Sequence, residues 1–177
     1  MATPEIGPRL LIRPARVDDA AALREIYNEA IQDDLATFET EPRSLDEQRR
    51  LIAGAESDLR HPILVAELRG WVLGWITIQP YDLRLQLQDI GEVFVFVRRS
   101  FRSYGVGRQL MKAVQTDAPG LAYRKFIGRV LGDHHGSIGL CKACGWREVG
   151  RFEKHARHGE TLRDVMMLEY LVPAAVA

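Results

Sequence analysis

The sequence lacks several features that mark particular classes of protein. Its 177 residues contain two cysteines, too few for a disulfide framework, and no run of about 18 apolar residues that would span a membrane. Met1–Pro8 shows no basic-plus-apolar signal pattern. The 24 basic and 24 acidic residues cancel, which gives no general support for nucleic-acid binding. We therefore expect a cytoplasmic protein that binds neither nucleic acid nor membrane.

The length of the chain predicts one domain, residues 1–177, that is large enough to bury a core. Apolar periodicity predicts strands and helices in the order β, α, α, three or four strands, α, β, α, β, β. This mixture of hairpins and helical crossovers predicts a mixed α/β sheet with helices on both faces. The expected strands are 10–13, 63–68, 71–79, 91–98, 125–131, 146–153 and 161–170, and the expected helices begin near residues 20, 44, 109 and 133.

Capping and turn residues support several of these boundaries. Ser44-Leu45-Asp46-Glu47 has the spacing of a capping box, which predicts the start of the second helix. Arg69-Gly70 lies between two apolar runs and predicts a hairpin turn. Gly145 follows the last expected helix and is a plausible C-terminal cap.

One glycine-containing stretch, residues 102–108, links an apolar strand to an amphipathic helix. Gly105 and Gly107 allow a tight turn, because glycine has no Cβ. The unpaired amides at the start of the following helix suit a phosphate. Arg98, Arg99, Arg102 and Arg108 are expected to surround this position with positive charge. We interpret the stretch as a pyrophosphate cradle, although a plain turn with a solvated basic rim fits the same residues.

The stretch matches neither of two common phosphate-binding motifs. No Gly-Lys-Ser/Thr follows, and the three-glycine dinucleotide pattern is absent. Arg102, Gly105 and Gly107 instead resemble the Arg/Gln-x-x-Gly-x-Gly/Ala signature of the GNAT family of acyl-CoA-dependent N-acyltransferases. Residues 26–31, 37–43 and 145–150 further resemble the phosphinothricin acetyltransferase-like branch of that family.

The resemblance implies a GNAT-like mixed, mostly antiparallel central sheet and acetyl-CoA as cosubstrate. No metal is expected. It implies transfer of the acetyl group to the primary amine of a small molecule, such as an amino acid or an analogue, by a protein that is often a homodimer. The implied cofactor-binding residues are Val95, Phe96, Val97, Arg102, Ser103, Tyr104, Gly105, Val106, Gly107, Arg108 and His134.

Glu92 begins the strand that leads to the glycine turn, and a carboxylate there would accept the proton that the acceptor ammonium must lose. In the resembling branch, the glutamate at this place is the general base. The alternative is a surface glutamate at the end of a strand. A backbone N–H of Phe94 to Val97 is expected to stabilise the developing oxyanion.

The helix near residues 136–144 departs from the family. His134 replaces a family asparagine that contacts pantetheine, and Cys141 replaces a histidine or tyrosine linked to protonation of the leaving thiolate. Cys141 is either that acid or a small buried apolar residue. A zinc site formed by His134, His135, Cys141 and Cys144 is a weaker alternative, because helical spacing separates the histidines from the cysteines.

The resemblance places Phe38 and Arg84 on the substrate side, although an aromatic residue at position 38 fits the core equally well. Asp82 and Leu87 replace a cation and a tyrosine of the herbicide-detoxifying members, so an anionic phosphinic acid should bind less well. The histidines and cations in residues 151–158 are expected to form a basic loop, either solvated or at the mouth of the substrate site.

Two other functions fit the sequence. A non-catalytic acyl-CoA-binding or sensor module is suggested by the changes at His134 and Cys141, although Glu92 argues against it. A different phosphate-ligand protein that shares only the glycine turn would not be stabilised by acetyl-CoA.

Overall fold

The structure is a computed structural model that describes residues 10–34, 38–158 and 160–174. Met1–Pro8, in which no signal pattern was found, and Thr37 of the expected substrate loop lie outside these residues. Among the described helices, none combines the length and apolar character needed to cross a membrane.

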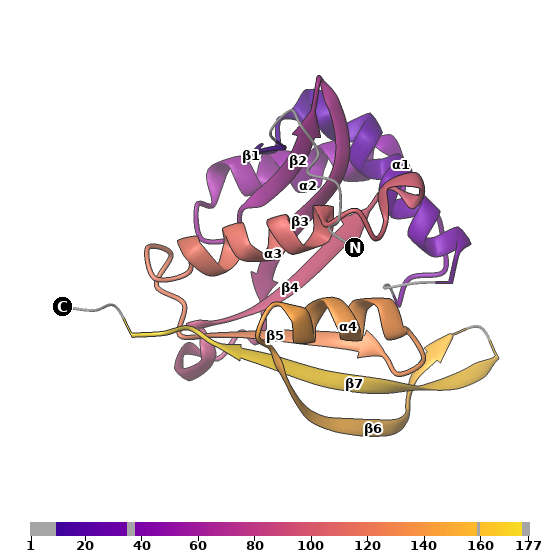
Figure 1. Cartoon of the computed structure of the whole chain (residues 1–177), viewed down its shortest axis with the longest axis vertical. Helices are drawn as coiled ribbons and strands as arrows, with labels where there is room; N and C mark the ends of the chain where they lie inside the picture. Colours follow the sequence, from indigo (N-terminus) through magenta and orange to yellow (C-terminus); the bar gives the residue numbers. More distant parts are fainter. Residues whose placement is uncertain (1–9, 35–37, 159, 175–177) are drawn as a thin grey trace, which may run out of the picture.

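Seven strands form one mixed sheet in the spatial order β1-β2-β3-β4-β5-β7-β6 (Figure 1). Every neighbouring pair is antiparallel except β4 and β5, which are parallel. The predicted mixed, mostly antiparallel sheet is therefore confirmed. The strands are β1 (Leu11–Pro14), β2 (Ile63–Leu68), β3 (Trp71–Pro80), β4 (Ile90–Val97), β5 (Lys125–Leu131), β6 (Arg147–His158) and β7 (Thr161–Leu171).

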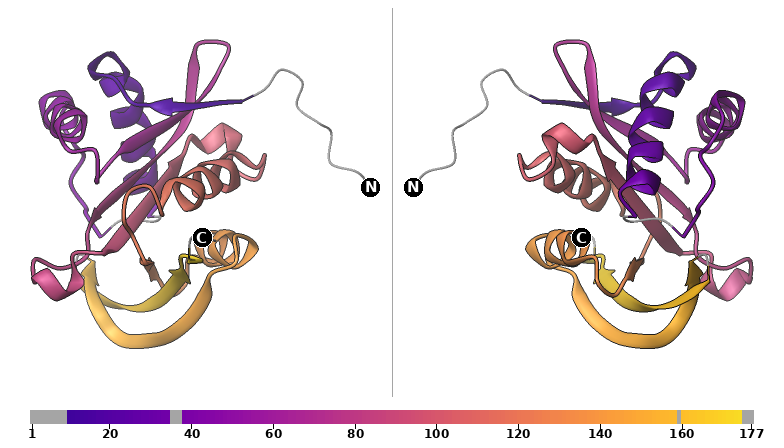
Figure 2. Two further views of the ribbon diagram at one scale, coloured as in Figure 1. Left: turned by 90° about the vertical axis from the view of Figure 1, so that its left-hand side faces the viewer. Right: turned by 90° about the vertical axis from the view of Figure 1, so that its right-hand side faces the viewer.

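Helices cover both faces of the sheet, as predicted (Figure 2). The helices are α1 (Ala20–Gln32), α2 (Leu45–Ser57), α3 (Val106–Asp117) and α4 (His135–Ala143). One apolar cluster lies between the first two helices and the sheet and includes Leu23, Ile52 and Trp75. A second cluster joins α3 and α4 to the other face and includes Ile76 and Leu110. Each fully buried side chain of this size contributes about 1.5–3 kcal/mol.

The local signals in the sequence have the expected structural effects. Ser44 and Glu47 form a reciprocal capping box at the start of α2. Arg69 and Gly70 have φ angles of 51° and 82°, as a tight hairpin between β2 and β3 requires. Gly145 ends α4 with a φ of 82°.

The expected basic loop at residues 151–158 is wrong, because these residues belong to β6. This strand lies at the edge of the sheet and pairs only with β7, so most of its side chains are exposed and charged residues are tolerated. Two register shifts, between Glu148 and Gly150 and between Phe152 and Ala156, explain why its alternation was hard to read.

The parallel pair β4 and β5 separates part-way along its length. Only Ile90, Gly91 and Glu92 of β4 pair with β5, at Lys125, Phe126 and Ile127. On its other side β4 stays paired with β3 as far as Val97. The second half of β4 therefore has one edge that β5 does not cover, inside an otherwise continuous sheet.

Candidate active site

A groove with a volume of about 400 Å³ lies beside the uncovered edge of β4. One wall is the β4 segment Val95–Val97, and α4 forms another. Its lining residues include Val95, Phe96, Val97, Arg102, Ser103, Gly105, Gly107, Arg108, His134, Ser137 and Leu140. Nine of the eleven expected cofactor-binding residues are in this lining. Of the other two, Tyr104 is exposed and Val106 packs its side chain into the core.

The backbone direction along β4 identifies the groups that face the groove. The N–H of Arg98 donates to the carbonyl of Leu73, and the carbonyl of Ile90 accepts from the N–H of Tyr81. The backbone N–H and C=O groups of the even-numbered residues of β4 therefore point toward β3. Because backbone groups alternate along a strand, Val95 and Val97 turn theirs toward the uncovered edge. The sequence alone could not distinguish among the four candidate N–H groups.

The turn before α3 leaves its amides available. Gly105 has a φ of 85° and directly precedes α3. Within the described part of the chain, the first amide beyond residue 102 with a protein acceptor is that of Gln109, which donates to the carbonyl of Gly105. The amides of residues 103–108 and the positive end of the α3 dipole thus form a site suited to an anion.

Gly107 is required for a different reason from Gly105. It lies within α3, and a Cβ there would be 3.0 Å from Leu140 of α4. Its small size therefore allows the two helices to approach each other beside the groove. The sequence had assigned both glycines to the turn, because a contact between distant helices leaves no local signal.

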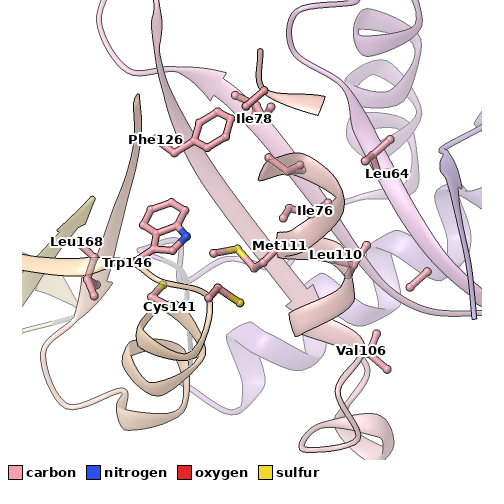
Figure 3. Packing of buried hydrophobic residues seen from close by; sticks show 14 of the residues in the cluster. Leu64, Ile76, Ile78, Val106, Leu110, Met111, Phe126, Cys141, Trp146 and Leu168 are labelled. Carbon is pink, nitrogen blue, oxygen red and sulfur yellow. The ribbon is translucent and has the colours of Figure 1, made fainter. Parts of the chain in front are cut away.

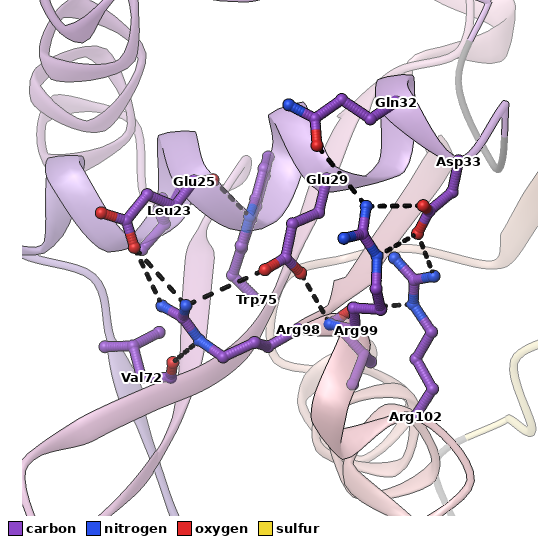
Figure 4. A network of polar contacts seen from close by, with 11 residues as sticks. Leu23, Glu25, Glu29, Gln32, Asp33, Val72, Trp75, Arg98, Arg99 and Arg102 are labelled. Atoms are coloured by element: carbon purple, nitrogen blue, oxygen red, sulfur yellow. Dashed lines mark hydrogen bonds and ion pairs between the residues drawn. The ribbon is translucent and has the colours of Figure 1, made fainter.

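The expected ring of four arginines is only partly correct. Arg98 and Arg99 are not in the groove lining, because the acidic residues of α1 and its C-terminal end hold them (Figure 4). Arg98 pairs with Glu25, and Arg99 pairs with Asp33. Arg102 and Arg108 line the groove. The guanidinium of Arg102 also donates hydrogen bonds to the carboxylate of Asp33 and to the carbonyl of Val97, which hold its position.

His134 lies just before α4 and lines the groove. Its Nδ1 atom is buried and has no hydrogen-bond partner among the described residues. Burial, followed by the nearby charge of Arg102, lowers the pKa of His134 below its ordinary value. The imidazole lines the groove and can form a hydrogen bond with a group bound there.

A second cavity, of about 220 Å³, lies on the side of the sheet that α1 and α2 cover. Five aromatic side chains line it, namely Tyr27, Phe38, Trp75, Phe94 and Phe96. Its polar lining residues are Glu39, Arg43, Thr77 and Gln79. Phe96 also lines the first groove, so the two cavities meet at β4.

Glu92 is buried, with 3% of its surface exposed. It points to the same face of β4 as Phe94 and Phe96, because alternate residues of a strand share a face. Both carboxylate oxygens accept hydrogen bonds from Arg129 of β5, from Nε at 2.6 Å and from Nη2 at 2.5 Å. Across the sheet Glu92 pairs with Gln79, which lines the aromatic cavity. The carboxylate therefore borders that cavity without being in its lining.

Residues 23–146 match the Acetyltransferase (GNAT) family. The chain belongs to this family. It is 31% identical over 141 residues to a phosphinothricin N-acetyltransferase of Alcaligenes faecalis, covering 78% of this chain and 71% of the relative. An L-methionine sulfoximine/L-methionine sulfone acetyltransferase of Pseudomonas paraeruginosa is 28% identical over 141 residues, with 79% and 81% covered. The sequence-based resemblance to GNAT proteins and to the phosphinothricin acetyltransferase-like branch is confirmed.

A solved GNAT structure shows the same fold. The phosphinothricin acetyltransferase of Sinorhizobium meliloti, in complex with AcCoA, superposes with a TM-score of 0.85 at 23% identity. The match covers 92% of this chain and 88% of that chain. The predicted fold class is therefore confirmed. The family match and the relatives named above show that the chain is an N-acetyltransferase.

Cys141 of this GNAT protein lies in the core and not in the groove lining. It is 6% exposed and packs with Trp146, Met111 and Leu168 (Figure 3). Burial raises the pKa of its thiol to about 12. The placement argues against the expected role in protonating the leaving thiolate and favours the alternative, a small apolar residue.

Arg84 lies outside both cavity linings. Its side chain is 71% exposed and donates from Nε and Nη2 to Asp82, at 2.9 and 2.6 Å. This contact with Arg84 lowers the pKa of the Asp82 carboxyl to about 2. The expectation that Arg84 contacts substrate is therefore not supported by its position, since Asp82 gives this arginine a local partner.

No group of three or more His, Cys, Asp or Glu side chains in the described ranges is placed to hold a metal ion. Cys141 and Cys144 are both free and buried. The alternative zinc site therefore has no support from the arrangement of these side chains.

Sequence reasoning missed two residues of the site, Arg129 and Asp33. Arg129 interrupts the apolar pattern of β5, and a charged residue inside a buried strand is a signal that it has a partner. Asp33 carried no such signal, because an acidic residue at the end of a surface helix is common.

Proposed function

We propose that this GNAT protein transfers the acetyl group of acetyl-CoA to the primary amine of a small molecule, an amino acid or an analogue of one. One observation carries the proposal. Unpaired amides at the start of α3 face a groove that runs along the uncovered edge of β4, and the buried carboxylate of Glu92 lies on the opposite face of the same strand.

The diphosphate of acetyl-CoA would be held by the amides of residues 103–108, with Arg108 beside it. The pantetheine would lie along Val95–Val97 and pair with the backbone groups that β5 leaves uncovered. His134 supports this position, because its imidazole lines the groove beside Val95–Val97 and can form a hydrogen bond with a pantetheine amide. Acetyl-CoA supplies the activated thioester.

The acceptor would enter through the aromatic cavity and present its amine next to Glu92. The carboxylate accepts a proton from the ammonium, directly or through a water molecule, because only the neutral amine has a lone pair for attack. The nitrogen then attacks the thioester carbon, and the N–H of Val95 stabilises the developing oxyanion.

Collapse of the tetrahedral intermediate breaks the C–S bond and leaves an amide and a CoA thiolate. The nitrogen has by then lost two protons. One balances the thiolate to give the CoA thiol, and the other is released to solvent. Because Cys141 lies in the core, we do not assign it the role of donating the thiol proton.

The aromatic cavity, which we call the acceptor cavity, suits an apolar or weakly polar acceptor side chain. Arg43 is the cation in its lining, and its guanidinium lies 3.7 Å from the centre of the Tyr27 ring and donates to Glu39. A phosphinate would have to compete with Glu39 for this cation. We therefore propose a methionine-sulfone-like amino acid, in preference to phosphinothricin, as the acceptor.

The test is release of free CoA thiol from acetyl-CoA in the presence of a panel of amines. The panel contains methionine sulfone, methionine sulfoximine, phosphinothricin, phenylalanine and simple alkylamines. Amine-dependent thiol release supports the proposal. Tight acetyl-CoA binding with no release for any amine would instead favour the sensor module.

We also propose the cellular location, the oligomeric state and the domain organisation of the protein. We propose a cytoplasmic location, which the low cysteine content supports. A homodimer is proposed from the family resemblance alone. A single domain over residues 1–177 is supported by the length of the chain and by the family match over residues 23–146.

A further inference from the structure

The ion pair between Arg129 and Glu92 leaves part of the arginine unused. Glu92 accepts from Nε and from one N–H of Nη2. A guanidinium carries five N–H donors, so three of them are not engaged by Glu92. The Arg129 side chain is 42% exposed, although its partner is buried. Arg129 thus combines a fixed position with donors that remain accessible.

The unused donors lie on the acceptor side of the sheet. Ile127 pairs with Glu92, so Arg129, two residues further along β5, points to the same face. Phe94, two residues beyond Glu92 on β4, and Gln79, opposite Glu92 on β3, both line the aromatic cavity. The arginine therefore lies next to the carboxylate, on the face of the sheet that carries the cavity, although it is not in the cavity lining.

The pair presents opposite charges to whatever reaches Glu92. An acceptor amine must come within hydrogen-bond distance of Glu92, or of a water molecule on it, to lose its proton. In an α-amino acid the carboxylate is bonded to the carbon that carries this amine. When the amine meets Glu92, the carboxylate falls beside Arg129, whose planar donors match carboxylate geometry. A simple alkylamine would leave these donors without a partner.

We propose that Arg129 selects acceptors that carry a carboxylate next to the reacting amine, by donating to it the N–H groups that Glu92 does not use. This inference rests on the proposed function and narrows its acceptor to α-amino acids and their analogues. The alternative is that Arg129 only orients Glu92, in which case its loss would affect all amines equally.

The experiment compares pairs of acceptors that differ by the carboxylate. The pairs are methionine sulfone with 3-(methylsulfonyl)propylamine, and phenylalanine with 2-phenylethylamine. For each pair, the ratio of kcat/KM for the amino acid to kcat/KM for the amine is measured in the wild type, Arg129→Gln and Arg129→Lys. The two members of a pair differ in the pKa of their ammonium group, and this difference is the same for every protein variant. The informative quantity is therefore the change in the ratio from the wild type to each variant. Arg151→Gln is the matched control, because Arg151 is also a strand arginine paired with a carboxylate, that of Asp164 on β7.

Loss of hydrogen bonds to a charged group should lower the ratio by about 10- to 100-fold in Arg129→Gln. Arg129→Lys should recover part of it, and Arg151→Gln should leave it unchanged. An unchanged ratio in Arg129→Gln, even with much lower turnover of both acceptors, would overturn the inference and leave Arg129 as a positioning residue for Glu92.

A binding measurement separates this inference from the proposed function. If no amine in the panel is acetylated, the proposed function fails. Calorimetric titration of the same pairs into the protein with CoA still tests the arginine. Tighter binding of the amino acid that disappears in Arg129→Gln supports carboxylate recognition, and equal binding of both members to the wild type contradicts it.

Discussion

The carboxylate of Asp33, directly after the C-terminal end of α1, accepts a 2.5 Å hydrogen bond from Nη1 of Arg102 in the turn before α3 (Figure 4). The same carboxylate accepts from Arg99, at 2.6 and 2.9 Å. Arg99 and then Arg102 lower the pKa of the Asp33 carboxyl. Five residues after Asp33, Phe38 lines the acceptor cavity. Asp33 thus links the C-terminal end of α1 to the turn that faces the cofactor groove.

Replacing Asp33 by Asn should weaken acetyl-CoA binding several-fold, because Arg102 and the turn lose their main anchor. We expect a loss of about 1 kcal/mol in the free energy of unfolding, since these ion pairs are partly exposed. Calorimetry with acetyl-CoA and urea denaturation measure the two effects. Asp46→Asn, which breaks an exposed pair with Arg49 on α2, is the control. Unchanged acetyl-CoA affinity in Asp33→Asn would show that the anchor has no role in binding.

Replacing Glu92 by Gln should lower turnover by about 10²–10⁴-fold, the usual effect of losing a positioned base. Acetyl-CoA affinity should stay near that of the wild type, because Glu92 does not line the groove. Steady-state kinetics and calorimetry separate these two outcomes. Glu148→Gln, which alters an exposed carboxylate on β6 paired with Lys142, controls for general effects. Near-normal turnover would remove Glu92 from the mechanism.

Replacing Cys141 by Ala should leave turnover within about twofold of the wild type, because the thiol lies in the core. The free energy of unfolding should fall by about 1 kcal/mol, as is typical of a small change in a packed core. Kinetics together with thermal unfolding provide the measurement. A large loss of kcat with unchanged stability would return Cys141 to the role of acid.

Acidification should weaken the fold through Glu169, a buried carboxylate of β7. Lys125, at 2.7 Å, and then Arg147 lower its pKa below the ordinary value of 4.5. The unfolded chain therefore takes up the proton first, so this contribution to stability is complete above pH 4.5 and is lost as the pH falls through the folded-state pKa.

The variant Glu169→Gln tests whether ionised Glu169 stabilises the fold and loses this effect in acid. Its free energy of unfolding at neutral pH should be lower by about 1–3 kcal/mol, because two cations lose their shared partner. Its stability should then change less than that of the wild type between about pH 5 and pH 3. Denaturation at a series of pH values provides the comparison. Parallel acid profiles for the two proteins would contradict the assignment.

The fold was predictable where local chemistry decides it. The capping box at Ser44 and Glu47, the positive φ at Gly70 and the left-handed Gly105 each act within a few residues, so the sequence displays them directly. The long edge strand β6 was underestimated, because bulges interrupt its alternation and no second packed layer imposes an apolar face.

The site was predictable only in part, because some of its residues act through contacts between distant segments. Glu92 and the amides before α3 lie in one continuous stretch, and their chemistry could be inferred from their order. The partners of that stretch come from β5 and from the C-terminal end of α1. Arg129, the partner of Glu92, is 37 residues away in the sequence, and Asp33, the partner of Arg102, is 69 residues away. The two interpretations of Cys141 could not be separated, since the sequence does not show which face of α4 meets the core.

The central claim is that the amides after residue 102 bind the diphosphate of acetyl-CoA, and it can be measured directly from backbone amide chemical shifts of the ¹⁵N-labelled protein. Adding CoA should shift the resonances of Ser103 to Arg108 strongly, whereas pantetheine, which has no phosphate, should shift mainly those of Val95 to Val97. Binding of CoA that leaves the amides of Ser103 to Arg108 unshifted would contradict the account.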